Sequence, residues 1–195
     1  MEQTTQWAPS VILIDADYLD MIAEDFSINF GRILNRVLSK ADLCHLLNCI
    51  VLDSGIQPGD NKIQVHFLHS KGKESLDYFI PSHFEQDLSG LSFIDNIGSF
   101  RLFTFPVEEI VSMEEFFLQS MTMLADAKEI ENLMVVGNMD AYGEDAKKIC
   151  SKTDGKKITL FSVMSPIDSG EGFSKAILAY PLMSALGIKS DECVE

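Results

Sequence analysis

Residues 11–17 read Val-Ile-Leu-Ile-Asp-Ala-Asp, and residues 133–140 read Leu-Met-Val-Val-Gly-Asn-Met-Asp. In both stretches a continuous apolar run ends in acidic or amide side chains and then passes into a helical pattern. An apolar run without polar alternation is typical of a strand that is covered on both faces, as in parallel sheets. These two stretches therefore predict two central strands of a parallel sheet.

Three further apolar runs, each flanked by turn or polar residues, predict three more strands. They span Ile63–Leu68, Phe100–Phe105 and Ile158–Val163. Helical patterns lie between the strands, and this alternation favours an α/β fold. We expect a Rossmann-like three-layer sandwich: a mainly parallel five-stranded sheet with helices on both faces, in which the first and fourth strands are central neighbours.

Several stretches between and after the strands carry helical signals, and one of them follows the fourth strand with Ala146, Ile149 and Cys150 inward. Apolar residues recur at helical spacing in Leu19–Val37 and in Leu43–Val51. Ser112–Glu115 is a capping box that opens a further helix. The tail, Phe173–Ile188, reads as a short apolar helix that is interrupted at Pro181.

The length and composition favour one domain. The chain has 195 residues, of which 46% are hydrophobic and 23% charged, so it can bury a sizeable core. We expect a single domain over residues 1–195, with a core at about residues 10–165 and a C-terminal extension over residues 166–195.

The charge balance is acidic, with 15 Lys and Arg against 30 Asp and Glu and a net charge of −15. This excludes a broad electrostatic attraction to nucleic acid or to an anionic membrane. The start, Met1–Ser10, lacks the features of a signal peptide, and no apolar run reaches the roughly 18 residues that span a bilayer. We therefore expect a cytoplasmic protein without a membrane partner, with Cys44 and Cys49 as reduced core residues.

The polar residues that follow the two central strands are the candidate site. If these strands are neighbours, then Asp15, Asp17, Asn138 and Asp140 face one crevice at the carboxyl end of the sheet. Carboxylates this close repel one another unless a cation joins them, and oxygen ligands suit Mg²⁺ or Mn²⁺. A structural interpretation stands beside this one, because Asp17 and Asp140 each precede a helical pattern and would cap its first turn.

The order of these motifs resembles the PIN-like superfamily and is nearest to its NYN domains. Val11–Asp17 is similar to the first acidic motif of that family. Leu133–Ile149, which contains Gly-Asn-Met-Asp-Ala-Tyr, is similar to its signature strand–turn–helix, and Lys157–Val163 is similar to its last core strand. The resemblance spans most of residues 10–165.

This resemblance implies a metal-dependent ribonuclease that coordinates Mg²⁺ or Mn²⁺ through a cluster of acids. Asp15, Asp140 and Glu115 would be the catalytic acids, and Asp17 and Asn138 would complete the metal site. The family commonly carries Asp at the position of Asn138, which here lacks the charge that holds the ion. The resemblance therefore also allows an inactive member.

A second resemblance is to haloacid dehalogenase-like phosphatases. Asp15-Ala-Asp17 after an apolar strand is similar to their opening motif, in which the first Asp is the nucleophile. Leu19 stands where that family usually has Thr, and the helical pattern begins directly after Asp17. This interpretation ranks below the PIN-like one.

Two classes of function therefore remain open. The first is a Mg²⁺- or Mn²⁺-dependent ribonuclease or phosphoesterase whose substrate is RNA or another phosphodiester. The second is a non-catalytic PIN-like scaffold or protein-interaction module. Trp7 and Phe173–Ile188 either cover the sheet of their own chain or form the surface of a homodimer.

Overall fold

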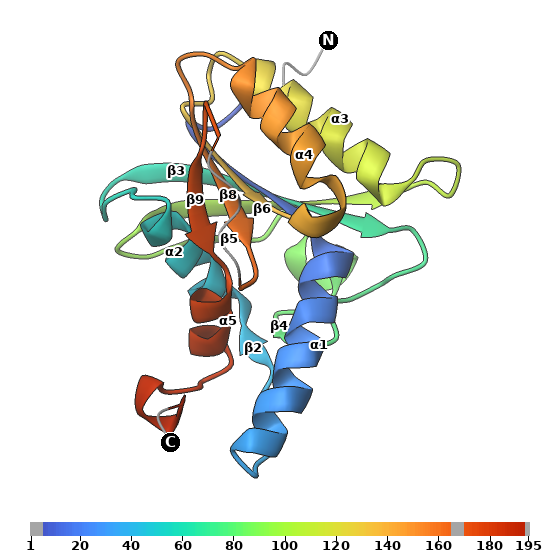
Figure 1. The fold of residues 1–195 in the computed structure, drawn as a ribbon, viewed down its shortest axis with the longest axis vertical. Coiled ribbons are helices and arrows are strands. Elements are labelled where there is room, and N and C mark those ends of the chain that lie inside the picture. Colours follow the sequence, from blue (N-terminus) through green and yellow to red (C-terminus); the bar gives the residue numbers. More distant parts are fainter. Residues whose placement is uncertain (1–5, 165–169, 194–195) are drawn as a thin grey trace.

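The computed structural model describes residues 6–164 and 170–193 and shows an α/β protein with helices on both faces of a mainly parallel sheet (Figure 1). The strands of the main sheet are β1 (Ser10–Asp15), β3 (Asn61–Ser70), β5 (Ser92–Ile94), β6 (Gly98–Val107), β7 (Asn132–Val136), β8 (Lys157–Ser162) and β9 (Ser174–Ile177). The α-helices are α1 (Ala16–Ile33), α2 (Leu43–Asp53), α3 (Met113–Asp126), α4 (Met139–Ser151) and α5 (Ala179–Ala185). In this part of the chain, no helix has the length and apolar character needed to cross a membrane.

The seven strands lie in the order β5-β6-β3-β1-β7-β8-β9, and every neighbouring pair is parallel except β5 and β6. The five strands expected from the sequence form the contiguous middle of this sheet, and β1 and β7 are neighbours at its centre as predicted. The expectation of five strands was wrong, because β5 and β9 add one strand at each edge. Both are short, and their exposed or half-buried residues lack a continuous apolar run.

Alternating side chains divide the core into two layers. On β3, Ile63, Val65 and Phe67 belong to the layer that α1, α2 and α5 cover. The next residue along from Phe67, Leu68, belongs to the opposite layer, which α3 and α4 cover. Figure 1 shows α3 and α4 on one side of the sheet and the other helices on the opposite side. This alternation follows from the two-residue period of a strand.

The C-terminal segment completes the fold. Residues 174–177 pair with β8 as the edge strand β9, and α5 then packs Leu182 into the core layer that α1 and α2 share. The prediction that Pro181 interrupts this helix was wrong. Pro181 lies in the first turn of α5, where a missing backbone N–H breaks no helical hydrogen bond.

A small two-stranded parallel sheet links the connection between α1 and α2 to the connection between β3 and β6. It pairs β2 (Ala41–Asp42), which precedes α2, with β4 (Phe79–Ile80). β4 belongs to the long connection between β3 and β6, which also contains a π-helical turn at Phe84–Leu88. Figure 1 shows this small sheet beside α1, away from the main sheet.

Candidate functional site

The carboxyl ends of β1 and β7 lie side by side at the centre of the sheet. The helices that follow these two strands cover opposite faces of the sheet. Ile14 pairs with Val136 in parallel register, and the two strands then lead into helices on opposite faces. α1 follows β1 on one face, and α4 follows β7 on the other (Figure 1). This divergence leaves Asp15 and Asn138 at the point where open α/β sheets bind ligands.

Asp15 is held by hydrogen bonds on both of its carboxylate oxygens. It is only 4% exposed. Its Oδ1 accepts a hydrogen bond of 3.0 Å from the backbone N–H of Tyr18 and so caps α1. Its Oδ2 accepts a hydrogen bond of 2.8 Å from the hydroxyl group of Tyr142. The same hydroxyl group accepts a hydrogen bond of 2.8 Å from the backbone N–H of Asn138, so Tyr142 bridges the ends of β1 and β7.

Burial disfavours charge at this point. It raises the pKa of Asp15, although the hydrogen bonds from Tyr18 and Tyr142 act against this effect. Burial and the negative charges of Asp140 and Asp15 raise the pKa of Tyr18 to about 12. Burial and the charge of Asp15 also raise the pKa of Tyr142. The Tyr142 hydroxyl group therefore stays protonated at neutral pH and remains a donor to Asp15.

Asp17 is directed toward β3 rather than β7. Its carboxylate accepts hydrogen bonds from the backbone N–H of Ser70, at 3.1 Å to Oδ2, and from the Ser70 hydroxyl group. Ser70 is the last residue of β3, so this contact fixes the first turn of α1 against that strand. The oxygens of Asp17 are thus occupied by protein donors, like those of Asp15.

Asn138 and Asp140 have different roles at the start of α4. Asn138 is the N-cap, and its Oδ1 accepts a hydrogen bond of 3.1 Å from the backbone N–H of Ala141. Asp140 is exposed in the first turn, where its negative charge stabilises the helix through a favourable interaction with the helix dipole. The prediction that Asp17 and Asp140 are the two caps was wrong by two residues, because α1 begins at Ala16 with Asp15 as its N-cap and α4 begins at Met139 with Asn138 as its N-cap.

Glu115 lies on α3 and makes one of the two contacts of a capping box. Its backbone N–H donates a hydrogen bond of 3.1 Å to the Ser112 hydroxyl group, as the sequence predicted. Its exposed carboxylate accepts 3.3 Å from Gln119 within the same helix. Within residues 6–164 and 170–193, no three or more His, Cys, Asp or Glu side chains are grouped so that they could hold a metal ion.

Asp20 is a buried acid that the sequence did not single out. It is 4% exposed on the inner face of α1 and pairs with Lys73 at 2.7 Å. It also accepts hydrogen bonds of 3.0 Å from the backbone N–H groups of Asp77 and Tyr78. Asp20 therefore holds the long connection between β3 and β6 against α1. The available signal was an acid beside Leu19 on the apolar stripe of a helix.

A histidine with a hydroxyl and a thiol neighbour lies where α2 meets α5. Nε2 of His45 is 2.7 Å from the Ser184 hydroxyl oxygen and 3.6 Å from Sγ of Cys49. Burial, together with the charge of Asp53, raises the pKa of the Cys49 thiol, which disfavours the thiolate that nucleophilic catalysis needs. Cys44 and Cys49 are both half-buried, so their prediction as core residues was wrong.

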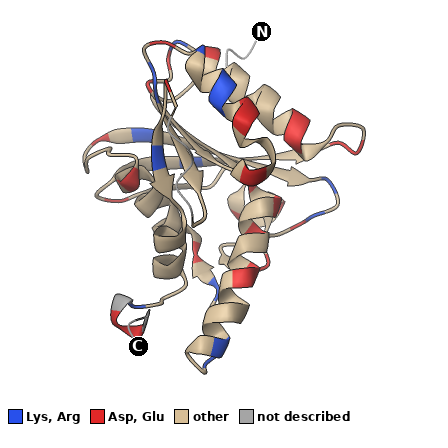
Figure 2. Cartoon of the chain, in the orientation of Figure 1, with Lys and Arg blue, Asp and Glu red and all other residues tan. Residues whose placement is uncertain are grey.

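The surface is acidic around the carboxyl ends of β1 and β7, the switch point at which the chain passes to opposite faces of the sheet. Figure 2 shows Asp and Glu along α1, α3 and α4. The first turns of these helices carry Asp17, Glu114 with Glu115, and Asp140, respectively. These negative charges stabilise the N-terminal turns of the helices, and they repel an approaching polyanion such as RNA.

The fold and this polar switch point define the chain as an α/β protein with a mainly parallel sheet. The chain belongs to a family of unknown function (DUF6621), whose model matches residues 4–193. No curated protein and no solved structure matches the chain.

Proposed function

We propose that this protein is a non-catalytic α/β domain, a PIN-like scaffold with a Rossmann-like arrangement, that works by binding a partner. The observation that carries this proposal is the hydrogen bond from Tyr142 to Asp15. A protonated hydroxyl group occupies the Asp15 oxygen that would otherwise be offered to a metal ion or to a substrate.

The state of the other acids supports the same proposal. A metal ion needs deprotonated carboxylates with free lone pairs directed at one point. The Asp17 carboxylate accepts from Ser70, and the Asn138 oxygen accepts from Ala141. Burial raises the pKa of Asp15 and so favours its neutral form. Each predicted ligand except Asp140 thus already has a structural partner.

The second candidate is a Mg²⁺- or Mn²⁺-dependent ribonuclease or phosphoesterase. One observation favours it: Asp15 ends β1, and Asp140 lies in the first turn of the helix that follows the neighbouring strand β7, so two acids lie at the same end of the sheet. Asp15, Asp17, Asn138 and Asp140 would hold the ion after displacement of the Tyr142 hydroxyl group. The ion would then polarise a phosphodiester and activate water.

A haloacid dehalogenase-like phosphatase fits the geometry less well. Asp15 would have to attack a phosphoryl group, but it is 4% exposed and both of its oxygens accept hydrogen bonds. α1 begins at Ala16, directly after it. Burial and these hydrogen bonds disfavour an attack by Asp15 on a phosphoryl group.

The partner follows from the charge. With a net charge of −15, the domain is better suited to a protein surface that carries Lys and Arg than to RNA. A cytoplasmic location and a homodimer are further parts of the proposal. Analytical ultracentrifugation tests the homodimer directly.

An RNA cleavage assay tests the function. Labelled single-stranded RNA is incubated with Mg²⁺ or Mn²⁺ and with the wild type, Asp15→Asn or Asp25→Asn, the last being a control at an exposed acid of α1. We expect the three proteins to give the same background cleavage. Cleavage by the wild type and Asp25→Asn that disappears in Asp15→Asn would contradict the proposal and support the nuclease.

A further inference from the structure

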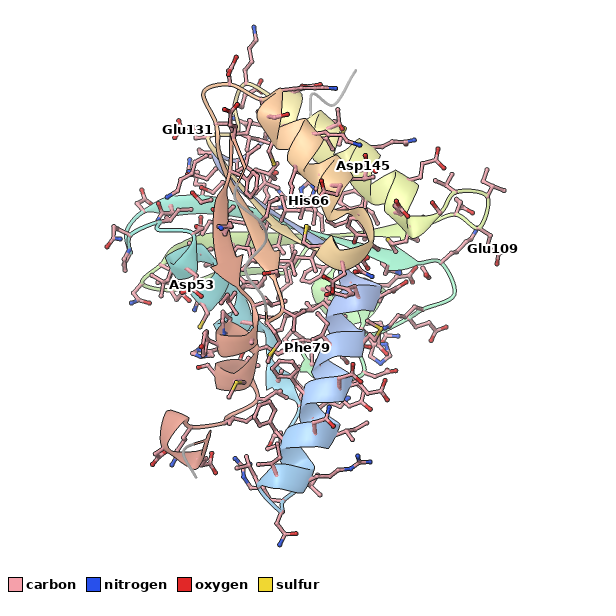
Figure 3. All side chains as sticks on the ribbon, viewed as in Figure 1. Asp53, His66, Phe79, Glu109, Glu131 and Asp145 are labelled. Carbon is pink, nitrogen blue, oxygen red and sulfur yellow. The ribbon has the colours of Figure 1, made fainter. Side chains whose placement is uncertain are left out.

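A cavity of about 280 Å³ lies between α3 and the strands β3 and β6, on the sheet face opposite α1. Three residues from one side of α3, Phe116, Ser120 and Met123, form its roof. The remainder of the lining includes Trp7, Gln64, His66, Phe103 and Phe105. Figure 3 shows His66 between the sheet and the layer of α3 and α4. The cavity exists because these helices pack mainly over β1, β7 and β8 and leave part of β6 uncovered.

Aromatic rings surround His66 in this cavity. The centre of its ring is 5.7 Å from that of Trp7, 5.5 Å from that of Phe103 and 5.2 Å from that of Phe105. Burial lowers the pKa of His66 to about 4, so the imidazole is neutral at pH 7. The lining therefore carries no charge at neutral pH, and a charged ligand would lose its hydration without a counter-charge.

Gln64 also lines the cavity, and its side chain carries an unused acceptor. Its side chain is nine-tenths buried, and its Nε2 donates 3.0 Å to the backbone oxygen of Gln6. Its Oε1 is buried and has no hydrogen-bond partner among the described residues. A buried acceptor without a donor destabilises the folded state, so a ligand that supplies a donor gains affinity.

We propose that this cavity binds a small, uncharged, planar ring compound that donates an N–H or O–H hydrogen bond to Oε1 of Gln64. The volume would hold about nine water molecules at roughly 30 Å³ each, which is the size of a two-ring compound. Largely apolar walls with a few placed polar groups are the usual character of such sites. Neither Asp15 nor Tyr142 lines this cavity, so the proposal does not depend on the proposed function.

Calorimetric titration with two matched probes tests the proposal. Indole carries an N–H donor, and benzofuran has nearly the same shape without one. We expect the wild type to bind indole about tenfold more tightly than benzofuran, because only indole satisfies the Gln64 oxygen. Gln64→Leu should bring the affinity for indole down to that for benzofuran.

Two helix variants test the location without changing Gln64. Ser120→Phe places a ring in the cavity and should abolish binding of indole, whereas Ser151→Phe, at an exposed position of α4, should leave it unchanged. The proposal is overturned if the wild type does not bind indole at millimolar concentration, if both probes bind equally, or if Ser120→Phe retains full affinity. These outcomes decide the proposal even if Gln64→Leu does not fold.

Discussion

The hydroxyl group of Tyr142 donates a hydrogen bond of 2.8 Å to Oδ2 of Asp15, although 127 residues separate the two in the sequence. This contact joins the first turn of α4 to the end of β1. It closes the point of the sheet where a ligand would otherwise meet a free carboxylate. The function of the switch point therefore depends on whether this hydrogen bond is permanent.

Removing the Tyr142 hydroxyl group should destabilise the protein. Tyr142→Phe leaves Oδ2 of Asp15 and the N–H of Asn138 without their partner, and an unsatisfied buried group costs about 1–3 kcal/mol. Urea denaturation measures the free energy of unfolding. Tyr180→Phe is the matched control, because Tyr180 is 71% exposed, and it should change that free energy by less than about 0.5 kcal/mol. Equal effects of the two variants would show that the Tyr142 contact is unimportant.

The stability should depend on pH through Asp15. Burial raises its folded-state pKa above the ordinary value of 3.8, so the folded protein binds the proton more tightly than the unfolded chain. The stabilisation that this gives is complete below pH 3.8 and is lost as the pH rises through the folded-state pKa. The free energy of unfolding of the wild type minus that of Asp15→Asn should therefore fall as the pH rises from 3.8 through the folded-state pKa of Asp15. A difference that rises or stays constant over this range would be inconsistent with a raised pKa.

Gly137 has to lack a side chain because Tyr142 lies against it. A Cβ atom at this position would be 2.6 Å from the Tyr142 hydroxyl oxygen and 2.8 Å from Cζ of Phe117. Gly137→Ala should therefore lower the free energy of unfolding by about 1–3 kcal/mol, as overpacking does. Gly59→Ala is the control, since a Cβ there meets no atom within 4 Å. Thermal unfolding of both variants would refute this explanation if Gly137→Ala were as stable as Gly59→Ala.

Asp20 should be among the most sensitive positions of α1. Asp20→Ala removes the partner of Lys73 and the acceptor of two backbone N–H groups, and the loss of a buried charged partner costs about 3 kcal/mol or more. Asp25→Ala changes an exposed acid of the same helix and should cost less than about 0.5 kcal/mol. Guanidinium denaturation compares the two. Similar losses would indicate that Asp20 acts only through helix propensity.

The middle of the sheet was predictable because burial on both faces leaves a local signal. Continuous apolar runs mark β1 and β7, and their parallel pairing followed from the alternation of strands and helices. The edge strand β9 carries the sequence Ser-Lys-Ala-Ile, which has no such signal. Its structure is determined by pairing with β8, and such tertiary pairing overrides local propensity.

The candidate site was predictable in position but not in chemistry. The sequence places Asp15 and Asn138 at neighbouring strand ends, and the structure agrees. The sequence does not show which side chains donate hydrogen bonds to the oxygens of Asp15 and Asn138. Tyr142 and Ser70 reach this site through contacts between residues far apart in the chain, and no local spacing encodes such contacts. The acids that suggested a metal site were therefore visible, whereas the donors that satisfy them were not.

The most direct test of the central claim is a calorimetric titration of Mg²⁺ and Mn²⁺ into the wild type, Asp15→Asn and the control Asp25→Asn. If the Tyr142 hydroxyl group holds Asp15 permanently, none of the three proteins shows saturable binding at millimolar ion concentrations, and their heats are the same. Saturable binding to the wild type and Asp25→Asn that is lost in Asp15→Asn would contradict the claim and establish the switch point as a metal site.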